Sequence, residues 1–314
     1  MQYRVQTLGT FQLKVRTGPS GIHLFDRKTG LNVLLDEVRV ASTLWPVAPR
    51  YVSVALTNAC DLACSYCYAP KDSSTLEFER LSSWLDELDA NGCLGVGFGG
   101  GEPTLYRRLP ELLAYAAKKT RLGVSFTTHG HRLDDALISS LTGNVHFVRV
   151  SVDGVGATYE ALRGRSFATL VRRLEAVRAL APIGLNFVVN AKTFPDLDAA
   201  TRLAAEVDAS EFLLLPEQPV RGRGGIDNLT KRELCRWVIG YRGTVPLMVS
   251  EAGADGLPTC NPLVLENGLS AHAHIDAAGI LKRSSHESDG VQIGSEGVIP
   301  ALEVLRRRYA EGRR

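Results

Sequence analysis

From Tyr51 onward, the sequence alternates between apolar strand patterns and amphipathic helix patterns. Each strand pattern is short, and the helix patterns between them carry apolar residues at helical spacing. The strand segments are YVSVAL (51–56), GVGF (95–98), GVSFTT (123–128), HFVRVSV (146–152), IGLNFVV (183–189) and EFLLL (211–215). Strands that alternate with helices form a parallel sheet, because each parallel pair needs a crossover connection. We therefore predict an α/β fold around six parallel strands.

The first 48 residues follow a different pattern. GIHLFDRKTGLNVLL alternates as strands do on either side of a turn from Asp26 to Gly30, which predicts a β-rich N-terminal appendage. The chain of 314 residues is 45% hydrophobic and carries a formal net charge of +2, so charge gives no argument for a nucleic-acid partner. No apolar run reaches the length of a membrane span, and the start MQYRVQTLGT lacks the apolar core of a signal peptide. We expect a cytoplasmic protein with no membrane partner.

The first of the six strands leads into a loop with three closely spaced cysteines, Cys60, Cys64 and Cys67. This C-x3-C-x2-C spacing can hold three irons of a 4Fe-4S cube and leave the fourth iron open for a ligand, whereas an electron-transfer cluster is held by four thiolates. A zinc knuckle is the alternative, but it needs a fourth Cys or His, and no His lies within thirty residues of the loop. Six cysteines without a secretory signal favour a reducing compartment over a disulfide framework.

A second motif, GVGFGGGEPTLY, ends the next strand and contains the carboxylate of Glu102. An amino acid chelated to an open iron through its amino and carboxylate groups places a positive amino group beside the cluster. Glu102 can accept a hydrogen bond from that group. The glycines at 99–101 allow a close backbone approach and a positive φ, which a side chain would resist.

Together, the cysteine loop and the glycine turn resemble the radical S-adenosylmethionine (SAM) enzymes. Tyr66 fills the aromatic position of that family's cysteine motif, and the family's GGEP is supplied by Gly100, Gly101, Glu102 and Pro103. The resemblance implies an open (β/α)6 partial TIM barrel that holds one 4Fe-4S cluster and SAM across the carboxyl ends of its strands. It divides the chain into the appendage (1–48), the radical SAM core (49–225), and a C-terminal helix with a small α+β, twitch-like extension (226–314).

The same resemblance implies cofactor contacts after the later strands. Ser151 and Asp153 match an SxDG segment that lies near the ribose and methionine parts of SAM, and Arg163 matches an arginine that could bind the SAM carboxylate. Asn190 and Leu215 stand at the ends of the fifth and sixth strands, where the family's cofactor pocket lies. For the polar residues, an ordinary turn or loop role is the alternative.

Three further strand-end residues are candidate substrate contacts. His129 stands where the family often has an asparagine, and Glu217 and Gln218 follow the sixth strand at the open mouth of the predicted barrel. Surface loop residues of these types are the alternative for all three.

The C-terminal stretch resembles the SPASM or twitch extension of peptide-modifying relatives, in which a cysteine after the second strand helps to bind an auxiliary cluster. Residues 282–285 are Lys, Arg, Ser and Ser, and Cys260 alone cannot hold a cluster. We therefore predict one cluster and a degenerate extension. Cys260 is then either a buried or idle thiol or a hydrogen donor to a substrate radical. Cys93 and Cys235 are predicted in the core, and His272 and His274 as solvated strand residues rather than metal ligands.

The resemblance implies that the reduced cluster cleaves SAM to methionine and a 5′-deoxyadenosyl radical, which takes hydrogen from a substrate. A ribosomally made peptide is the first choice of substrate, and the one-electron reductant would be a flavodoxin or ferredoxin. The alternatives are an epimerase or dehydratase of a small molecule and, from another class, an iron-sulfur electron carrier or a structural zinc protein.

Overall fold

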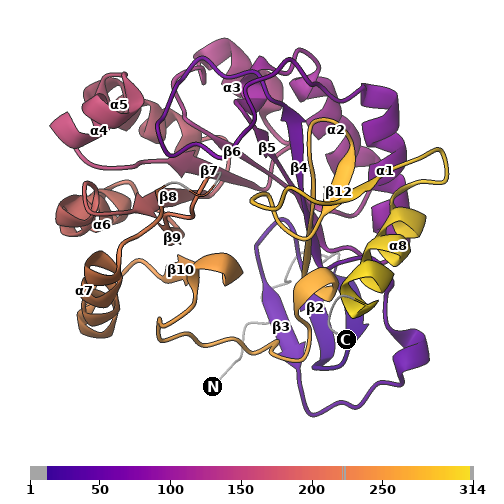
Figure 1. Cartoon of the computed structure of the whole chain (residues 1–314). Helices are drawn as coiled ribbons and strands as arrows, with labels where there is room; N and C mark the ends of the chain where they lie inside the picture. Colours follow the sequence, from indigo (N-terminus) through magenta and orange to yellow (C-terminus); the bar gives the residue numbers. More distant parts are fainter. Residues whose placement is uncertain (1–12, 221, 223, 312–314) are drawn as a thin grey trace, which may run out of the picture.

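The computed structural model describes residues 13–220, 222 and 224–311 (Figure 1). Its largest element is a ten-stranded sheet with the order β10-β9-β8-β7-β6-β5-β4-β11-β12-β13. The strands β4 to β9 run parallel in chain order. They are β4 (Tyr51–Thr57), β5 (Gly95–Gly100), β6 (Gly123–Thr128), β7 (Phe147–Ser151), β8 (Ile183–Val189) and β9 (Glu211–Pro216). These are the six strands expected from the sequence, and the α/β prediction is confirmed.

Helices cover one face of this sheet (Figure 1). They are α1 (Phe78–Ala90), α2 (Leu109–Lys119), α3 (Asp135–Leu141), α4 (Ala157–Arg163), α5 (Phe167–Arg178) and α6 (Leu197–Glu206). The short 3-10 turns η2 (Pro103–Leu105) and η3 (Phe194–Asp196) precede α2 and α6. Side chains cap some of the helices: the Asp134 carboxylate accepts a hydrogen bond from Leu137 N at 2.8 Å, which satisfies a free N–H at the start of α3.

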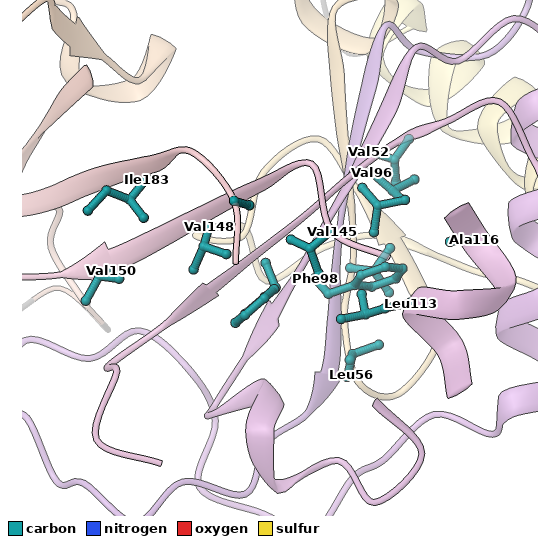
Figure 2. Close-up of a cluster of buried hydrophobic side chains, with 14 of the residues drawn as sticks. Val52, Leu56, Val96, Phe98, Leu113, Ala116, Val145, Val148, Val150 and Ile183 are labelled. Atoms are coloured by element: carbon teal, nitrogen blue, oxygen red, sulfur yellow. The ribbon is translucent and has the colours of Figure 1, made fainter. Parts of the chain in front are cut away.

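The hydrophobic core lies between the helices and the sheet. Figure 2 shows Val96 and Phe98 of β5 beside Leu113 and Ala116 of α2, with Val148 of β7 in the same cluster, all of them buried. Strand residues alternate between the two faces, so the other face has a different composition. On β6, for example, Val124 and Phe126 are buried, whereas Ser125 and Thr127 are half-buried on the opposite face. We call that opposite side, with its small and polar residues, the inner face.

The N-terminal region forms a separate three-stranded antiparallel sheet of β1 (Lys14–Gly18), β2 (Gly21–Phe25) and β3 (Asn32–Leu35). The turn expected from Asp26 to Gly30 joins β2 and β3, and Gly30 N donates to Asp26 O at 2.9 Å. Residues 1–12 lie outside the described part of the chain. After the turn η1 (Ser42–Leu44), the chain enters β4.

A buried ionic cluster joins this small sheet to the rest of the molecule. Glu266 is 4% exposed and pairs with Arg16 of β1 and with Arg50, which directly precedes β4. Arg50 also contacts the ring of His23 on β2. Because one carboxylate compensates two buried guanidinium groups from distant parts of the chain, it fixes the N-terminal sheet against the start of β4.

The C-terminal region extends both edges of the main sheet instead of forming an independent unit. Strand β10 pairs in parallel with β9, and β11 pairs in parallel with β4 at the opposite edge. The elements are α7 (Asn228–Gly240), β10 (Leu247–Val249), η4 (Glu251–Gly253), η5 (Gly268–Ser270), β11 (His272–Ile275), β12 (Ile280–Lys282), β13 (Val291–Gln292) and α8 (Val298–Glu311). The sheet edges of an open barrel expose unpaired backbone groups, and these added strands satisfy them.

The last helix packs beside α1 (Figure 1). The Glu87 carboxylate of α1 accepts hydrogen bonds from Val298 N at 2.6 Å and Ile299 N at 2.9 Å. A side chain of α1 therefore caps the start of α8. Within the described residues, no helix is long and apolar enough to cross a membrane.

The expectation for the strand histidines is wrong for His274. The parallel pairing of β11 with β4 places His274 beside Ser53 on the inner face, and the side chain is 6% exposed. Its Nδ1 lies 2.8 Å from Ser53 Oγ, and His272 Nε2 lies 3.1 Å from the same oxygen. Alternation along a strand does not reveal which strand covers it, and here the neighbour is β4.

Burial lowers the pKa of His274 to about 3, and the nearby His272 acts in the same direction. Because this value lies below the unfolded value of about 6.5, the unfolded chain takes up the proton first as the pH falls. The contribution of neutral His274 to the free energy of unfolding is therefore fully present above about pH 6.5 and is lost as the pH falls toward 3. At pH 5 the loss is about 2 kcal/mol. His274→Gln should remove this part of the pH dependence. Urea unfolding near pH 8 and near pH 5 measures it, and an unchanged difference between the two would contradict the assignment.

Candidate functional site

The cysteine loop leaves the carboxyl end of β4 and returns to it. Thr57 bridges to Thr75, and Asn58 N donates to Ser74 O at 2.9 Å, so the loop between them is closed at its base. Cys60, Cys64 and Cys67 within it are free and half-buried. Burial raises the pKa of Cys60, so a bound metal would have to displace a proton that this thiol holds firmly.

Tyr66 anchors the loop to the end of β7. Its hydroxyl donates to Asp153 Oδ2 at 2.7 Å, and burial followed by the Asp153 charge raises the pKa of Tyr66. Asp153 is fully buried, and it also pairs with Arg163 and accepts from Val188 N at 2.7 Å. The Arg163 guanidinium lies 5.8 Å from the centre of the Tyr66 ring. Two of the residues expected near SAM, Asp153 and Arg163, therefore lie together at Tyr66 and hold it in place.

Glu102 follows β5 and is 1% exposed. Its Oε1 accepts from Thr104 N at 3.1 Å, Thr104 Oγ1 at 2.7 Å and Thr128 Oγ1 at 2.8 Å. Its Oε2 accepts from His129 N at 3.0 Å. Donors from two segments, the turn η2 and the end of β6, thus fix a carboxylate at the strand ends, beside the cysteine loop. Pro103, the last residue of the GGEP turn, is buried and begins η2.

The glycines before Glu102 bring β5 against the cysteine loop. Gly100 has a φ of +114°, and a Cβ on Gly101 would lie 2.2 Å from Ala59 O, so larger residues would push the loop away. A Cβ on Gly99 would meet nothing within 4 Å, which leaves open space above the inner face. We expected a ligand at this close approach, but the neighbour of Gly100 is the end of β4 at Thr57, and the neighbour of Gly101 is the loop backbone at Ala59.

The site fits a 4Fe-4S cluster and SAM. Three free thiols lie on one loop, a fixed carboxylate stands beside it, and the buried Nε of Arg163 has no partner among the described residues. No three His, Cys, Asp or Glu side chains in that part of the chain converge on a single metal ion. We assign Cys60, Cys64 and Cys67 as the residues that would hold it.

His129 lies directly after β6 and is 4% exposed, which differs from an ordinary surface turn. Its Nε2 is 2.8 Å from Oδ1 of Asp61, the residue that follows Cys60. Asp61 is a site residue that the sequence analysis missed. A carboxylate beside a candidate ligand cysteine was the available signal, but its partner lies 68 positions away.

Other predicted residues lie at the carboxyl ends of the strands as expected, with varied roles. Ser151 and Leu215 are half-buried on the inner face of β7 and β9. The Asn190 amide donates to Glu217 Oε2 at 2.6 Å, and its oxygen accepts from Lys192 N at 2.9 Å. Gln218 donates to Pro216 O at 3.0 Å. Asn190, Glu217 and Gln218 therefore hold strand-end loops together in this structure.

The remaining cysteines are separate from the loop. Cys93 is fully buried, and burial raises its pKa to about 11, as expected for a core thiol. Cys235 is half-buried on α7. Cys260 is exposed in the segment between η4 and η5, which removes the buried alternative and leaves an idle thiol or a hydrogen donor.

The inner face also carries polar pairs that the sequence analysis missed. Arg149 of β7 pairs with Glu211 of β9 and donates to Asn186 Oδ1 of β8 at 3.3 Å. Tyr51 OH lies 3.0 Å from Ser125 Oγ. The available signal was a polar residue at alternate positions of apolar strands, which marks the face away from the helices.

Residues 54–203 match the model of the radical SAM superfamily, a range that contains all three loop cysteines and Glu102. The chain contains a radical SAM domain. This confirms the family indicated by the cysteine loop and the GGEP turn. Members of that family use a 4Fe-4S cluster and SAM.

Two curated relatives illustrate the range of this family. The mycofactocin maturase MftC of Mycolicibacterium smegmatis is 30% identical over 205 residues, which cover 61% of this chain and 52% of that protein. The Fe-coproporphyrin III synthase of Methanosarcina barkeri is 33% identical over 159 residues, which cover 48% of this chain and 40% of that protein. The chain thus spans about half the length of the curated relatives it matches.

Among solved structures, Streptococcus suis SuiB bound to S-adenosylmethionine is similar with a TM-score of 0.68 and 12% identity. The superposition covers 88% of this chain and 82% of SuiB. At this identity the likeness shows the fold, and it confirms the partial TIM barrel of the radical SAM domain.

Glu102→Gln tests the role of the buried carboxylate. The amide keeps an oxygen for the Thr104 and Thr128 donors but removes the charge, so iron content should persist. SAM affinity should fall by about 1.5 to 3 kcal/mol, the contribution of a charged hydrogen bond. Calorimetric titration of reconstituted protein measures this loss, and Glu111→Gln on the exposed surface of α2 serves as the control. Unchanged SAM binding would mean that Glu102 does not face the amino group.

Proposed function

We propose that this chain is a radical SAM enzyme that modifies a ribosomally synthesised peptide. When bound, the cluster and SAM supply reductive cleavage to methionine and a 5′-deoxyadenosyl radical, which abstracts a substrate hydrogen. The observation that carries the proposal is the loop of three free thiols fixed beside the buried Glu102 carboxylate.

The chain's own residues would bind and orient the cofactors. The three loop cysteines would hold the cluster, and Glu102 would accept the SAM amino group at Oε2, since three donors already occupy Oε1. Gly99 leaves space over the inner face for the cofactor or substrate. Asp153 would act mainly by holding Tyr66 and Arg163, and the Nε of Arg163 remains available to a carboxylate.

The peptide substrate is supported by the relatives' names. MftC is called a maturase, and a structure of SuiB has been solved with its precursor peptide SuiA. The antiparallel pairing of β11, β12 and β13 supports the proposal of a twitch-like extension, which is typical of peptide-modifying relatives. A flavodoxin or ferredoxin would supply the electron, and free thiols fit a reducing cytoplasm.

Chemistry on a small molecule is the second candidate. The similarity to Fe-coproporphyrin III synthase favours it, because that relative is named for a product that is not a peptide. The described residues after α7 also contain one cysteine, Cys260, which cannot hold an auxiliary cluster alone.

Co-expression with short reading frames adjacent to the gene distinguishes the two candidates. The peptide proposal expects a mass change in one encoded peptide, and it expects none with the Cys60, Cys64 and Cys67 alanine variant. In vitro, deuterium should pass from that labelled peptide into 5′-deoxyadenosine. SAM cleavage without any modified peptide, together with deuterium transfer from a small metabolite, would support the second candidate instead.

A further inference from the structure

A path of short contacts joins Glu102 to the cysteine loop through one side chain. The His129 ring nitrogen Nε2 lies 2.8 Å from Asp61 Oδ1 and 3.3 Å from Glu102 Oε2. Asp61 is bonded to Cys60, so the buried histidine touches both the candidate cofactor acceptor and the candidate cluster loop. The predicted role of His129 as a substrate contact does not explain why its ring lies against these two carboxylates.

The hydrogen bonds assign the proton on the His129 ring. Its Nδ1 accepts from His131 N at 3.1 Å, and a nitrogen that accepts carries no proton. The proton therefore sits on Nε2, where one N–H faces two carboxylates. The shorter distance favours Asp61, and Glu102 competes for the same proton.

Glu102 has room for one further donor on the side that His129 faces. Oε1 already accepts from three donors, whereas the contacts of Oε2 come from the backbone and ring of His129. An ammonium group arriving at Oε2 would occupy the lone pair that the ring shares. The Nε2 proton would then belong to Asp61 alone.

We propose that His129 is a positioning residue that couples SAM binding at Glu102 to the order of the cysteine loop. The inference rests on the proposed function in one respect, that the SAM amino group binds Glu102. Binding there strengthens the bond from His129 to Asp61 and so holds the loop against the end of β6. By linkage, a loop already held in place favours SAM binding.

The other partners of Asp61 are weaker anchors. Arg165 Nη2 lies 3.1 Å and Arg132 Nη1 3.9 Å from Asp61 Oδ2, and both guanidinium groups are more than 40% exposed. Ion pairs at such exposure are screened by solvent and contribute little. The buried His129 ring is therefore the main side-chain partner of Asp61.

Amide hydrogen exchange over residues 58–72 tests the coupling. It is measured in cluster-free protein and in reconstituted protein with and without SAM, for wild type, His129→Asn, Asp61→Ala and the double variant. The shorter asparagine cannot span the distance to Asp61, and Asp61→Ala changes a half-exposed loop residue, which keeps the fold testable. His131→Asn is the matched control in the same turn, since its ring contacts Tyr159 OH instead of the loop.

We expect loop exchange to rise about tenfold or more in each single variant, as for a lost charged hydrogen bond, and SAM affinity to fall by a similar factor. The double variant should be no worse than either single variant, because both remove one interaction. SAM should slow loop exchange in wild type and in His131→Asn only.

The inference would be overturned if amide exchange over residues 58–72 were as slow in both single variants as in wild type. It would also be overturned if SAM slowed that exchange in these variants as much as in wild type. Failure of wild type itself to bind or cleave SAM would instead overturn the proposed function. In that case, exchange in the cluster-free protein still shows whether His129 anchors the loop.

Discussion

Replacing Cys60, Cys64 and Cys67 together by alanine is expected to abolish iron binding and leave the fold intact. Wild type should bind about four irons per chain after anaerobic reconstitution, as for a single cube. The thiols lie on a loop that returns to β4 through the bridge from Thr57 to Thr75, so the core does not depend on them.

Iron and sulfide analysis measures the loss, and circular dichroism checks the fold. Cys235→Ala, which changes a half-buried thiol on α7, should keep the full iron content. Equal iron in the triple variant and wild type would refute the ligand assignment. An iron content near twice that of one cube, lost in part in Cys260→Ala, would restore an auxiliary cluster.

Asp153→Ala is expected to destabilise the protein, by about 3 to 5 kcal/mol, because it leaves the Arg163 charge buried without its partner. The sequence placed Asp153 near the ribose and methionine parts of SAM, where its loss would act on SAM binding. The structure predicts a larger effect on the free energy of unfolding. Asp153 is fully buried, pairs with Arg163, and accepts hydrogen bonds from the Tyr66 hydroxyl and Val188 N.

Tyr66→Phe is the matched control for this prediction. It removes one hydrogen bond to Asp153 and keeps the ion pair, so the free energy of unfolding should fall by only about 0.5 to 1.5 kcal/mol. Urea unfolding of the two variants measures the difference. Asp153→Ala with wild-type stability and a loss confined to SAM binding would show that the carboxylate serves the cofactor and not the fold.

The sequence predicted the parallel strands because their apolar runs are buried on the helix side. Val96, Phe98 and Val148 lie in such runs and are part of the core in Figure 2. The GGEP turn and the cysteine spacing predicted the family for a similar local reason, since the residues that carry it are close in the chain.

Long-range partners were beyond prediction from one sequence. Nothing in the local pattern says that Asp61 meets His129, that Glu266 meets Arg16, or that β11 pairs with β4. Each contact depends on how segments that are distant in the sequence are arranged in the fold. The same limit explains why His274 was expected in solvent: its burial arises from pairing with a strand more than two hundred positions earlier.

Reductive cleavage of SAM tests the central claim most directly. Anaerobically reconstituted protein is mixed with SAM and a one-electron reductant, and methionine and 5′-deoxyadenosine are quantified by mass spectrometry. We expect equal amounts of both products from wild type, a strong reduction in Glu102→Gln, and none from the triple cysteine variant. Iron-loaded wild type that binds SAM and yields neither product above the triple variant would contradict the assignment of this chain as a radical SAM enzyme.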